Sequence, residues 1–259
     1  MRQPHLFTLS VTVLALCACA TTQGEPGEPE YASSAEKNLA LGDEALSNKN
    51  YLEAEKYFEH VKTKYPFQEA SREAELRLAD AQLAREKYVE ARESYLAFIK
   101  LHPTHPKVDY AAFHAALTYA RDIPSDFFLL PPSYEKDQGD VRGALRSMND
   151  FIRQYPDSRW LEEARKVAAD ARTRIARYEL YVGDFYLKRG KWLGAAGRYE
   201  RVVREYPGLG LDEEALFGLH AAYEQLGEAE KAHAALQKVI QLFPGTSGAA
   251  RAERLLRGS

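Results

Sequence analysis

Cysteine is almost absent from this chain of 259 residues, and both copies, Cys17 and Cys19, lie within the first twenty positions. The remainder therefore has no thiol for a disulfide, a cysteine-ligated zinc site or a cysteine nucleophile. A surplus of charge is also missing, because 35 Lys and Arg oppose 38 Asp and Glu for a formal net charge of -3. Nucleic-acid-binding proteins usually carry a clear basic excess, so this near balance argues against a nucleic-acid partner.

Recognisable catalytic and metal-binding motifs are missing as well. His102 and His105 form an H-x-x-H pair, but each stands beside a proline and no third ligand is near in sequence. A structural role is therefore favoured over a metal site. No arrangement of serine, histidine and aspartate is typical of nucleophilic catalysis. We expect no catalytic residue, no metal and no cofactor.

One long apolar run occurs, from Leu6 to Leu16, and Arg2 precedes it. It is too short to span a bilayer and is typical of a signal peptide. The run ends in Leu16-Cys17-Ala18-Cys19, which resembles the bacterial lipobox. Residues 1–18 are therefore predicted to be a signal peptide, with Cys19 as the lipidated N-terminus of the mature protein. An ordinary signal peptide with incidental cysteines is the alternative.

The residues after Cys19 predict a protein held off a membrane by a tether. Ala20 comes next, and the absence of aspartate at that position is associated with sorting to the outer membrane. Residues 21–34 are rich in Gly, Pro, Glu and Ser, a composition that favours a flexible and partly extended chain. We expect residues 19–34 to be a lipidated flexible linker, with the folded part facing the periplasm.

The folded part is predicted to be a helical repeat. An alanine stands twelve residues before each of five prolines, a bulky apolar residue stands eight before, and Val or Phe stands five before. These offsets are typical of the tetratricopeptide repeat, a helix–turn–helix unit whose second helix ends at proline. The fold class is therefore all-α, an α-solenoid of five tetratricopeptide-like helix pairs. The marker prolines, each preceded by an aromatic residue or histidine, are Pro66, Pro103, Pro156, Pro207 and Pro244.

The distances between these prolines are unequal, at 37, 53, 51 and 37 residues. The third unit is therefore expected to carry an insertion at about residues 124–139, and its Phe127-Phe128-Leu129-Leu130 run is too apolar for a free loop. A long charged helix over residues 158–177 is predicted to follow. We divide the folded part into front repeats, residues 35–157, and a back part, residues 158–259, with the connecting helix, two repeats and a capping helix.

The first helices of tetratricopeptide repeats line the inner wall, so the register also predicts a groove. The front half is expected to be acidic on one side and aromatic on the other, which suits an extended peptide with an apolar anchor. Packing of the third unit's aromatic residues under the insertion is an equal alternative, and an enzyme pocket there would require clustered titratable groups. The predicted groove residues are Leu76, Leu83, Tyr110, Phe113 and Leu117.

Several short segments are more specific than the repeat itself. They are Lys64-Tyr65-Pro66-Phe67, Leu101-His102-Pro103-Thr104-His105-Pro106 with Asp109-Tyr110, Ala176-Arg177-Tyr178-Glu179, and Tyr186 with Arg189-Gly190 and Trp192. In these segments, and over nearly its whole length, the chain resembles the BamD (ComL) family. That family is the lipoprotein of the outer-membrane β-barrel assembly machine of Gram-negative bacteria. The cysteine inside the lipobox, the insertion and the last unit depart from the family pattern.

The resemblance implies a non-enzymatic scaffold. Front repeats would recognise targeting segments of unfolded outer-membrane proteins, and back repeats would dock the barrel-forming subunit and accessory assembly lipoproteins. Arg198, placed by the frame from Trp192 to Tyr199, matches the arginine that pairs with an acidic residue of the barrel-forming subunit. Its guanidinium is expected to point outward, and a solvated surface arginine is the alternative. Another periplasmic tetratricopeptide lipoprotein, a pilotin or a cell-division scaffold, is the competing function.

Overall fold

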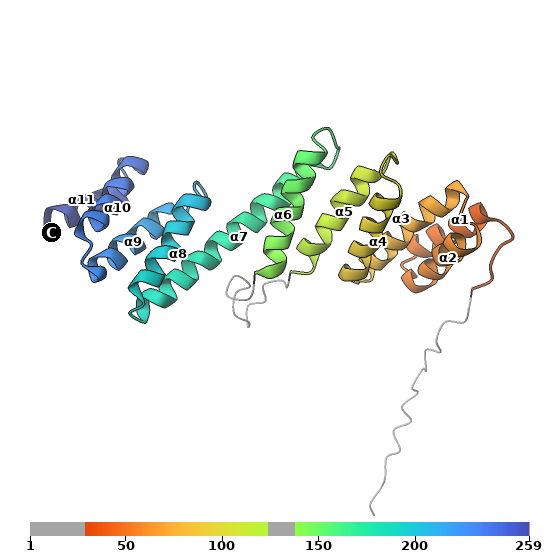
Figure 1. Cartoon of the computed structure of the whole chain (residues 1–259), viewed down its shortest axis with the longest axis horizontal. Coiled ribbons are helices and arrows are strands. Elements are labelled where there is room, and N and C mark those ends of the chain that lie inside the picture. Colours follow the sequence, from red (N-terminus) through yellow and green to blue (C-terminus); the bar gives the residue numbers. More distant parts are fainter. Residues whose placement is uncertain (1–28, 124–137, 259) are drawn as a thin grey trace, which may run out of the picture.

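A computed structural model gives the structure of the protein and describes residues 29–123 and 138–258. Within these residues every regular element is an α-helix, and the helices form an elongated row from α1 at one end to α11 at the other (Figure 1). The predicted signal peptide, Cys19 and the apolar run of the insertion lie outside the described residues. The helices are α1 (Ala35–Ser47), α2 (Tyr51–Lys64), α3 (Glu69–Ala84), α4 (Tyr88–Leu101), α5 (Val108–Arg121), α6 (Gly139–Gln154), α7 (Leu161–Lys188), α8 (Trp192–Glu205), α9 (Asp212–Leu226), α10 (Ala229–Leu242) and α11 (Ser247–Gly258).

Consecutive helices pack against one another along the whole row, so the predicted α-solenoid of helix pairs is confirmed. Each marker aromatic or histidine is the C-cap of a second helix, where the proline that follows prevents continuation. Tyr51, Tyr88 and Trp192 begin the second helices α2, α4 and α8. The C-cap residues are Tyr65 on α2, His102 on α4, Tyr155 on α6, Tyr206 on α8 and Phe243 on α10.

The repeated positions form the core. All five marker alanines and all five bulky residues eight before proline are at most 1% exposed. Small residues on the first helices permit this packing: a Cβ on Gly42 would lie 2.5 Å from the Phe58 ring, and one on Gly183 would lie 2.7 Å from the Tyr199 ring. The close approach of paired helices therefore depends on these glycines.

Helix α7 belongs to both halves of the molecule. It runs for 28 residues, further than predicted, and joins α6 to α8 (Figure 1). Its early residues Ala164 and Ala168 lie in one apolar cluster with Met148 of α6, whereas Leu180 lies in the cluster of α8 to α11. The predicted division between residues 157 and 158 lies in the turn before α7, and the helix that follows this turn is shared by both cores.

The last residues of the predicted linker are packed against the first repeat. The Asn38 side chain accepts from the Ala32 amide at 2.8 Å and donates to the Ala32 carbonyl at 2.9 Å. The Tyr31 ring stacks on His60 with centroids 3.8 Å apart. Ser34 caps α1 through its side chain. These side-chain contacts place residues 31–34 of the predicted linker against α1 and α2.

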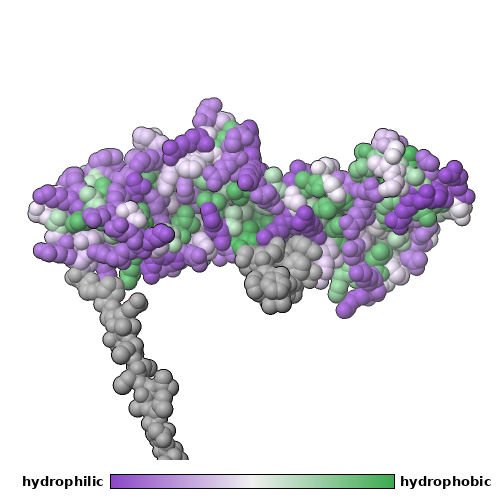
Figure 2. All heavy atoms as spheres, turned by 180° about the vertical axis from the view of Figure 1, so that it is seen from behind, coloured by the Kyte–Doolittle hydropathy of each residue, from purple (hydrophilic) through white to green (hydrophobic). Residues whose placement is uncertain are grey.

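The face of the molecule seen in Figure 2 is largely hydrophilic, with small separated apolar areas. Among the described helices, none is both long and apolar enough to cross a membrane. Helix α11 covers the apolar end of the last pair through Ala252, as the predicted capping helix should.

Candidate functional site

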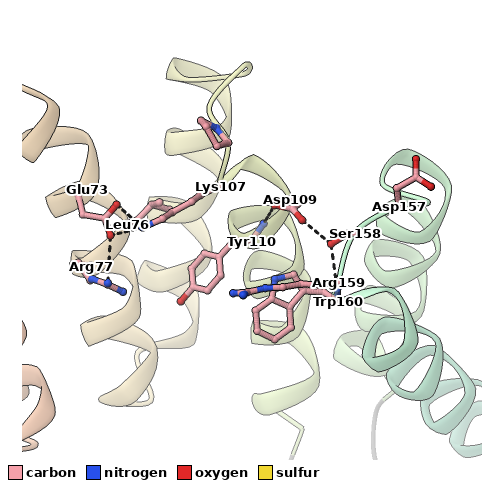
Figure 3. A pocket seen from close by; sticks show the side chains of 11 residues that line it. Glu73, Leu76, Arg77, Lys107, Asp109, Tyr110, Asp157, Ser158, Arg159 and Trp160 are labelled. Atoms are coloured by element: carbon pink, nitrogen blue, oxygen red, sulfur yellow. Dashed lines mark hydrogen bonds and ion pairs between the residues drawn. The ribbon is translucent and has the colours of Figure 1, made fainter.

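An open cavity of about 500 Å³ lies on the face formed by the first helices of the second, third and fourth units. Side chains from α3, from α5 and from the turn that begins α7 converge on it (Figure 3). Its size is sufficient for a few side chains of a peptide. The lining residues are Glu73, Leu76, Arg77, Pro106, Lys107, Asp109, Tyr110, Asp157, Ser158, Arg159 and Trp160.

Arg77 is the centre of the charged side of this cavity. Its guanidinium lies 3.0 Å from Asp43, 3.3 Å from Glu73 and 3.3 Å from Asp80. Lys107 joins the network through Glu73 at 2.6 Å. Desolvation raises the pKa of Asp43, although the Arg77 charge opposes that effect. With three carboxylates against two cations, the network keeps a surplus of negative charge, as the predicted acidic side requires.

Two phenols fix the position of Asp80. The hydroxyl groups of Tyr95 and Tyr110 each donate to Asp80 Oδ1 at 2.6 Å. Burial, and then the Asp80 charge, raise the pKa of both phenols, so they remain protonated donors at any physiological pH. This hydrogen bond holds the Tyr110 side chain between Arg77 of α3 and Trp160 (Figure 3).

Trp160 forms the aromatic wall of the cavity, and sequence reasoning did not select it. Its ring lies 5.9 Å from Tyr110 and stacks at 5.0 Å on Phe113. The Ser158 hydroxyl donates to Asp109 at 2.7 Å and accepts from the Trp160 amide at 3.2 Å, which fixes the turn before α7. The available signal was that Trp160, one of only 2 tryptophans, stands directly before the connecting helix and shortly after a marker proline.

The predicted groove residues separate into two groups. Leu76 and Tyr110 line the cavity, although Leu76 is only 1% exposed. Leu83 is partly buried against the α3–α4 core and does not line it. Phe113 is 1% and Leu117 9% exposed, within the core that joins α5, α6 and α7. Phe113 as a surface anchor is therefore wrong, because Trp160 and Phe151 cover its ring.

A second ionic centre lies in the back half, around Glu179 of α7. This carboxylate is only 1% exposed, yet three arginines from two other helices contact it. Arg198 Nη1 donates to Oε2 at 2.7 Å, and Oε1 accepts from Arg142 at 3.3 Å and from Arg201 at 3.2 Å. The hydrogen bond to Glu179 raises the pKa of Arg198. Charge-assisted bonds on both oxygens compensate for the burial of the carboxylate.

The position of Arg198 differs from the expectation. Its guanidinium does not simply point outward but is bound to Glu179, and the side chain is 28% exposed. Glu179 lies in one of the family segments, but no role was predicted for it from the sequence. The sequence did contain a signal for a buried role: Glu179 lies on a first helix one turn before Gly183, and this register position faces the second helix.

The histidines of the H-x-x-H pair contact carboxylates instead of each other. His102 Nε2 lies 2.8 Å from Glu75, and His105 Nε2 lies 3.6 Å from Glu69. Over residues 29–123 and 138–258, no three His, Cys, Asp or Glu side chains come together as metal ligands could. Both pairs join the turn after α4 to α3, which is a structural arrangement.

Comparison with known proteins gives a consistent set of relatives. A family model described as YfiO, outer membrane lipoprotein, matches residues 32–239. An outer membrane protein assembly factor BamD of Caulobacter vibrioides is 28% identical over 95% of this chain and 80% of its own length. The BamD of Neisseria meningitidis serogroup A is 29% identical over 88% and 86%. That of Xylella fastidiosa strain 9a5c is 30% identical over 77% and 70%.

Solved structures with a similar arrangement of helices are tetratricopeptide repeat proteins. The TPR2AB-domain:pHSP90-complex of yeast Sti1 has 16% identity and a TM-score of 0.41 over 86% of this chain and 84% of that one. A tetratricopeptide repeat protein from Parabacteroides merdae has 16% identity and a TM-score of 0.38 over 84% and 83%.

Proposed function

The chain belongs to the YfiO family of outer-membrane lipoproteins, and from that premise we propose that it is an assembly factor for outer-membrane proteins, a scaffold rather than an enzyme. Its relatives are named outer membrane protein assembly factor BamD, and the match to this chain covers most of their length. The repeat fold supplies extended surfaces that bind other polypeptides. The two halves offer two such surfaces of opposite charge.

The front cavity is the proposed receptor for targeting segments of unfolded outer-membrane proteins. The observation that supports this role is the combination of Tyr110 and Trp160 with Arg77, Lys107 and Arg159 in one open cavity. An aromatic side chain of the peptide would pack on Tyr110 and Trp160, where aromatic pairs contribute beyond their buried area. A backbone amide of the peptide would face the surplus of carboxylate around Arg77.

Photocrosslinking tests this receptor. A photoreactive amino acid in place of Tyr110 should capture a peptide copied from the C-terminal strand of an outer-membrane protein. The matched control is Tyr119, which lies on the same helix but lines a different cavity with Arg92 and Phe151. Capture at position 119 and not at 110 would contradict the proposed site.

The back repeats are the proposed dock for the periplasmic domains of the barrel-forming subunit and for accessory lipoproteins, with Arg198 as a contact. Affinity purification of the full chain from detergent-solubilised membranes should recover the barrel-forming subunit as the main partner. Recovery of a pilus secretin or of cell-division proteins would support the competing scaffold instead. A charge reversal, Arg198→Glu, should reduce recovery, and an acid-to-base change on the partner should restore it.

A lipid on Cys19 is the proposed attachment to the outer membrane, with the repeats in the periplasm. Two acyl-bearing groups would make the anchor stable, since each buried methylene contributes ~0.8 kcal/mol. Cys19→Ala should release the protein from the membrane fraction or stop its processing. Mass spectrometry of the mature N-terminus identifies the modified residue, and an unmodified N-terminus at another position would contradict the assignment.

A further inference from the structure

A strong local surplus of positive charge surrounds Glu179, although the whole chain has a net charge of -3. Beyond the three arginines on Glu179, Glu205 lies 2.8 Å from Arg204 and 4.0 Å from Arg201, and its backbone carbonyl accepts from Arg172 at 3.1 Å. Five arginines are thus linked to two glutamates. We call this group the arginine cluster: Arg142, Arg172, Arg198, Arg201, Arg204, Glu179 and Glu205.

The arginines of the cluster are accessible, whereas the carboxylate that holds them is not. The side chains of Arg142, Arg198 and Arg201 are 41%, 28% and 42% exposed, and Glu179 is 1% exposed. Without a central anion, three guanidiniums from α6 and α8 would repel one another. Glu179 therefore orients them while leaving part of each fork toward solvent, where it can meet another carboxylate bidentately.

Helix α8 presents an unusual surface beside the cluster. Leu193, Gly197 and Arg201 follow one another at intervals of four residues, so they share one side of the helix. Leu193 is 73% exposed, and nothing lies within 4 Å of the place where a Gly197 Cβ would be. Glycine in a helix interior is destabilising relative to alanine, and no internal packing requires it here. A partner that approaches α8 closely would explain both residues.

We infer that Glu179 is a positioning residue that holds Arg142, Arg198 and Arg201 ready for an acidic segment of a partner protein, which packs along the Leu193–Gly197 side of α8. This inference rests on the proposed function, in which the back repeats dock the barrel-forming subunit. It adds the buried carboxylate, two further arginines and a steric contact to the Arg198 pairing.

A protein partner fits these observations better than an anionic membrane. A lipid surface attracts any basic patch by its mean potential, so it gives no reason for a buried carboxylate that fixes arginine geometry. Protein interfaces are enriched in arginine around an apolar, closely packed centre. The combination of Leu193, Gly197 and oriented arginines has that composition.

Recovery of the barrel-forming subunit with the tagged full chain from detergent-solubilised membranes tests the inference. Glu179→Gln should weaken recovery roughly tenfold, because pairs of close interfacial charges couple at about that level or above. Arg201→Glu and Gly197→Leu should weaken it as well. Glu179→Asp, which keeps the charge, should restore part of it. The controls Glu162→Gln and Arg165→Glu alter an exposed pair on α7 and should leave recovery unchanged.

A second measurement separates positioning from folding. Val202 is fully buried in the apolar cluster of the back half, so Val202→Ala should lower the thermal midpoint without removing any charge of the arginine cluster. Val202→Ala should retain the barrel-forming subunit. Glu179→Gln should lose it even when each variant is assayed at the same interval below its own thermal midpoint.

Three results would overturn the inference. The first is unchanged recovery with folded Glu179→Gln, Arg201→Glu and Gly197→Leu, which would leave the proposed function intact. The second is native mass spectrometry that finds phosphatidylglycerol on the wild type and not on Glu179→Gln, with the barrel-forming subunit recovered equally. The third is absence of that subunit from the wild-type preparation, which would overturn the proposed function as well.

Discussion

The front and back halves each contain one central charge with three opposite charges around it, and the signs are reversed. In the front half Arg77 lies among Asp43, Glu73 and Asp80. In the back half Glu179 lies among three arginines. The burial also differs, because the Arg77 side chain is 34% exposed and that of Glu179 is 1% exposed. The same repeat thus supports an acidic surface on its first helices and a basic surface across α6 to α8.

The largest expected effect is the difference in stability loss between removing the buried Glu179 and removing the more exposed Arg77. Glu179→Ala leaves three guanidiniums without their anion, and we expect a loss of about 2–4 kcal/mol in the free energy of unfolding. Arg77→Ala should cost about 1 kcal/mol or less, because its partners can turn to solvent. Urea unfolding of both variants measures the contrast. Glu162→Ala, from an exposed pair, is the control, and equal losses for the two centres would break the comparison.

The next largest effect should be a difference between the halves in the stability cost of adding a methyl group to a glycine of a first helix. Gly183→Ala and Gly42→Ala both force a Cβ against a buried ring, which typically costs about 1–3 kcal/mol. The cost should be greater at Gly183, because the Tyr199 ring is also pressed against Gly218 and its hydroxyl is bonded to Asp184 at 2.6 Å. Phe58 has no hydroxyl to fix it. Thermal unfolding checks the order, and Gly197→Ala, with open space around it, should instead stabilise the protein.

The tyrosine–aspartate hydrogen bonds should show a smaller contrast. Tyr199→Phe removes the bond that ties Asp184 to α8, and we expect a loss of about 1 kcal/mol. Tyr95→Phe should cost less, because Asp80 keeps Tyr110 and Arg77. Unfolding in denaturant gives both values. A larger loss for Tyr95→Phe would mean that the front network depends on that one hydroxyl.

The smallest effect is a pH dependence that comes from His114, which stacks on the cavity residue Tyr110. Burial lowers the pKa of His114, whose ring stacks on Tyr110 at 4.0 Å. The unfolded chain therefore binds this proton more readily, so stability should fall as the pH drops below His114's ordinary value of about 6.5. His114→Gln should flatten that part of the profile. An identical profile in wild type and variant would show that another group titrates.

Much of the fold could be predicted from the sequence because each repeat unit packs its helices through the same positions. Alanine, a bulky residue and an aromatic–proline step recur at constant offsets, and each offset corresponds to a buried position or a helix end. The exact end of the linker was not predictable from composition, since Tyr31 is held by His60 and Ala32 by Asn38. The contact of Tyr31 with His60 in particular joins residues that are far apart in the sequence.

The sites were harder to predict for the same physical reason. Register placed Tyr110 and Phe113 on the same helix, but only tertiary packing decides that Trp160 covers Phe113 and leaves Tyr110 at the cavity. Similarly, the frame that selected Arg198 contains no information on Glu179, which approaches from another helix. Side chains that meet across three helices are invisible to a pattern along one.

The central claim is that the two halves bind different partners through separate surfaces. Two measurements on the same preparation test it most directly. One is capture of a substrate peptide at Tyr110, and the other is recovery of the barrel-forming subunit. Both are made in Trp160→Ala and in Arg201→Glu. The account predicts that Trp160→Ala loses peptide capture and keeps the subunit, and that Arg201→Glu does the reverse. Loss of both activities in either folded variant would contradict it.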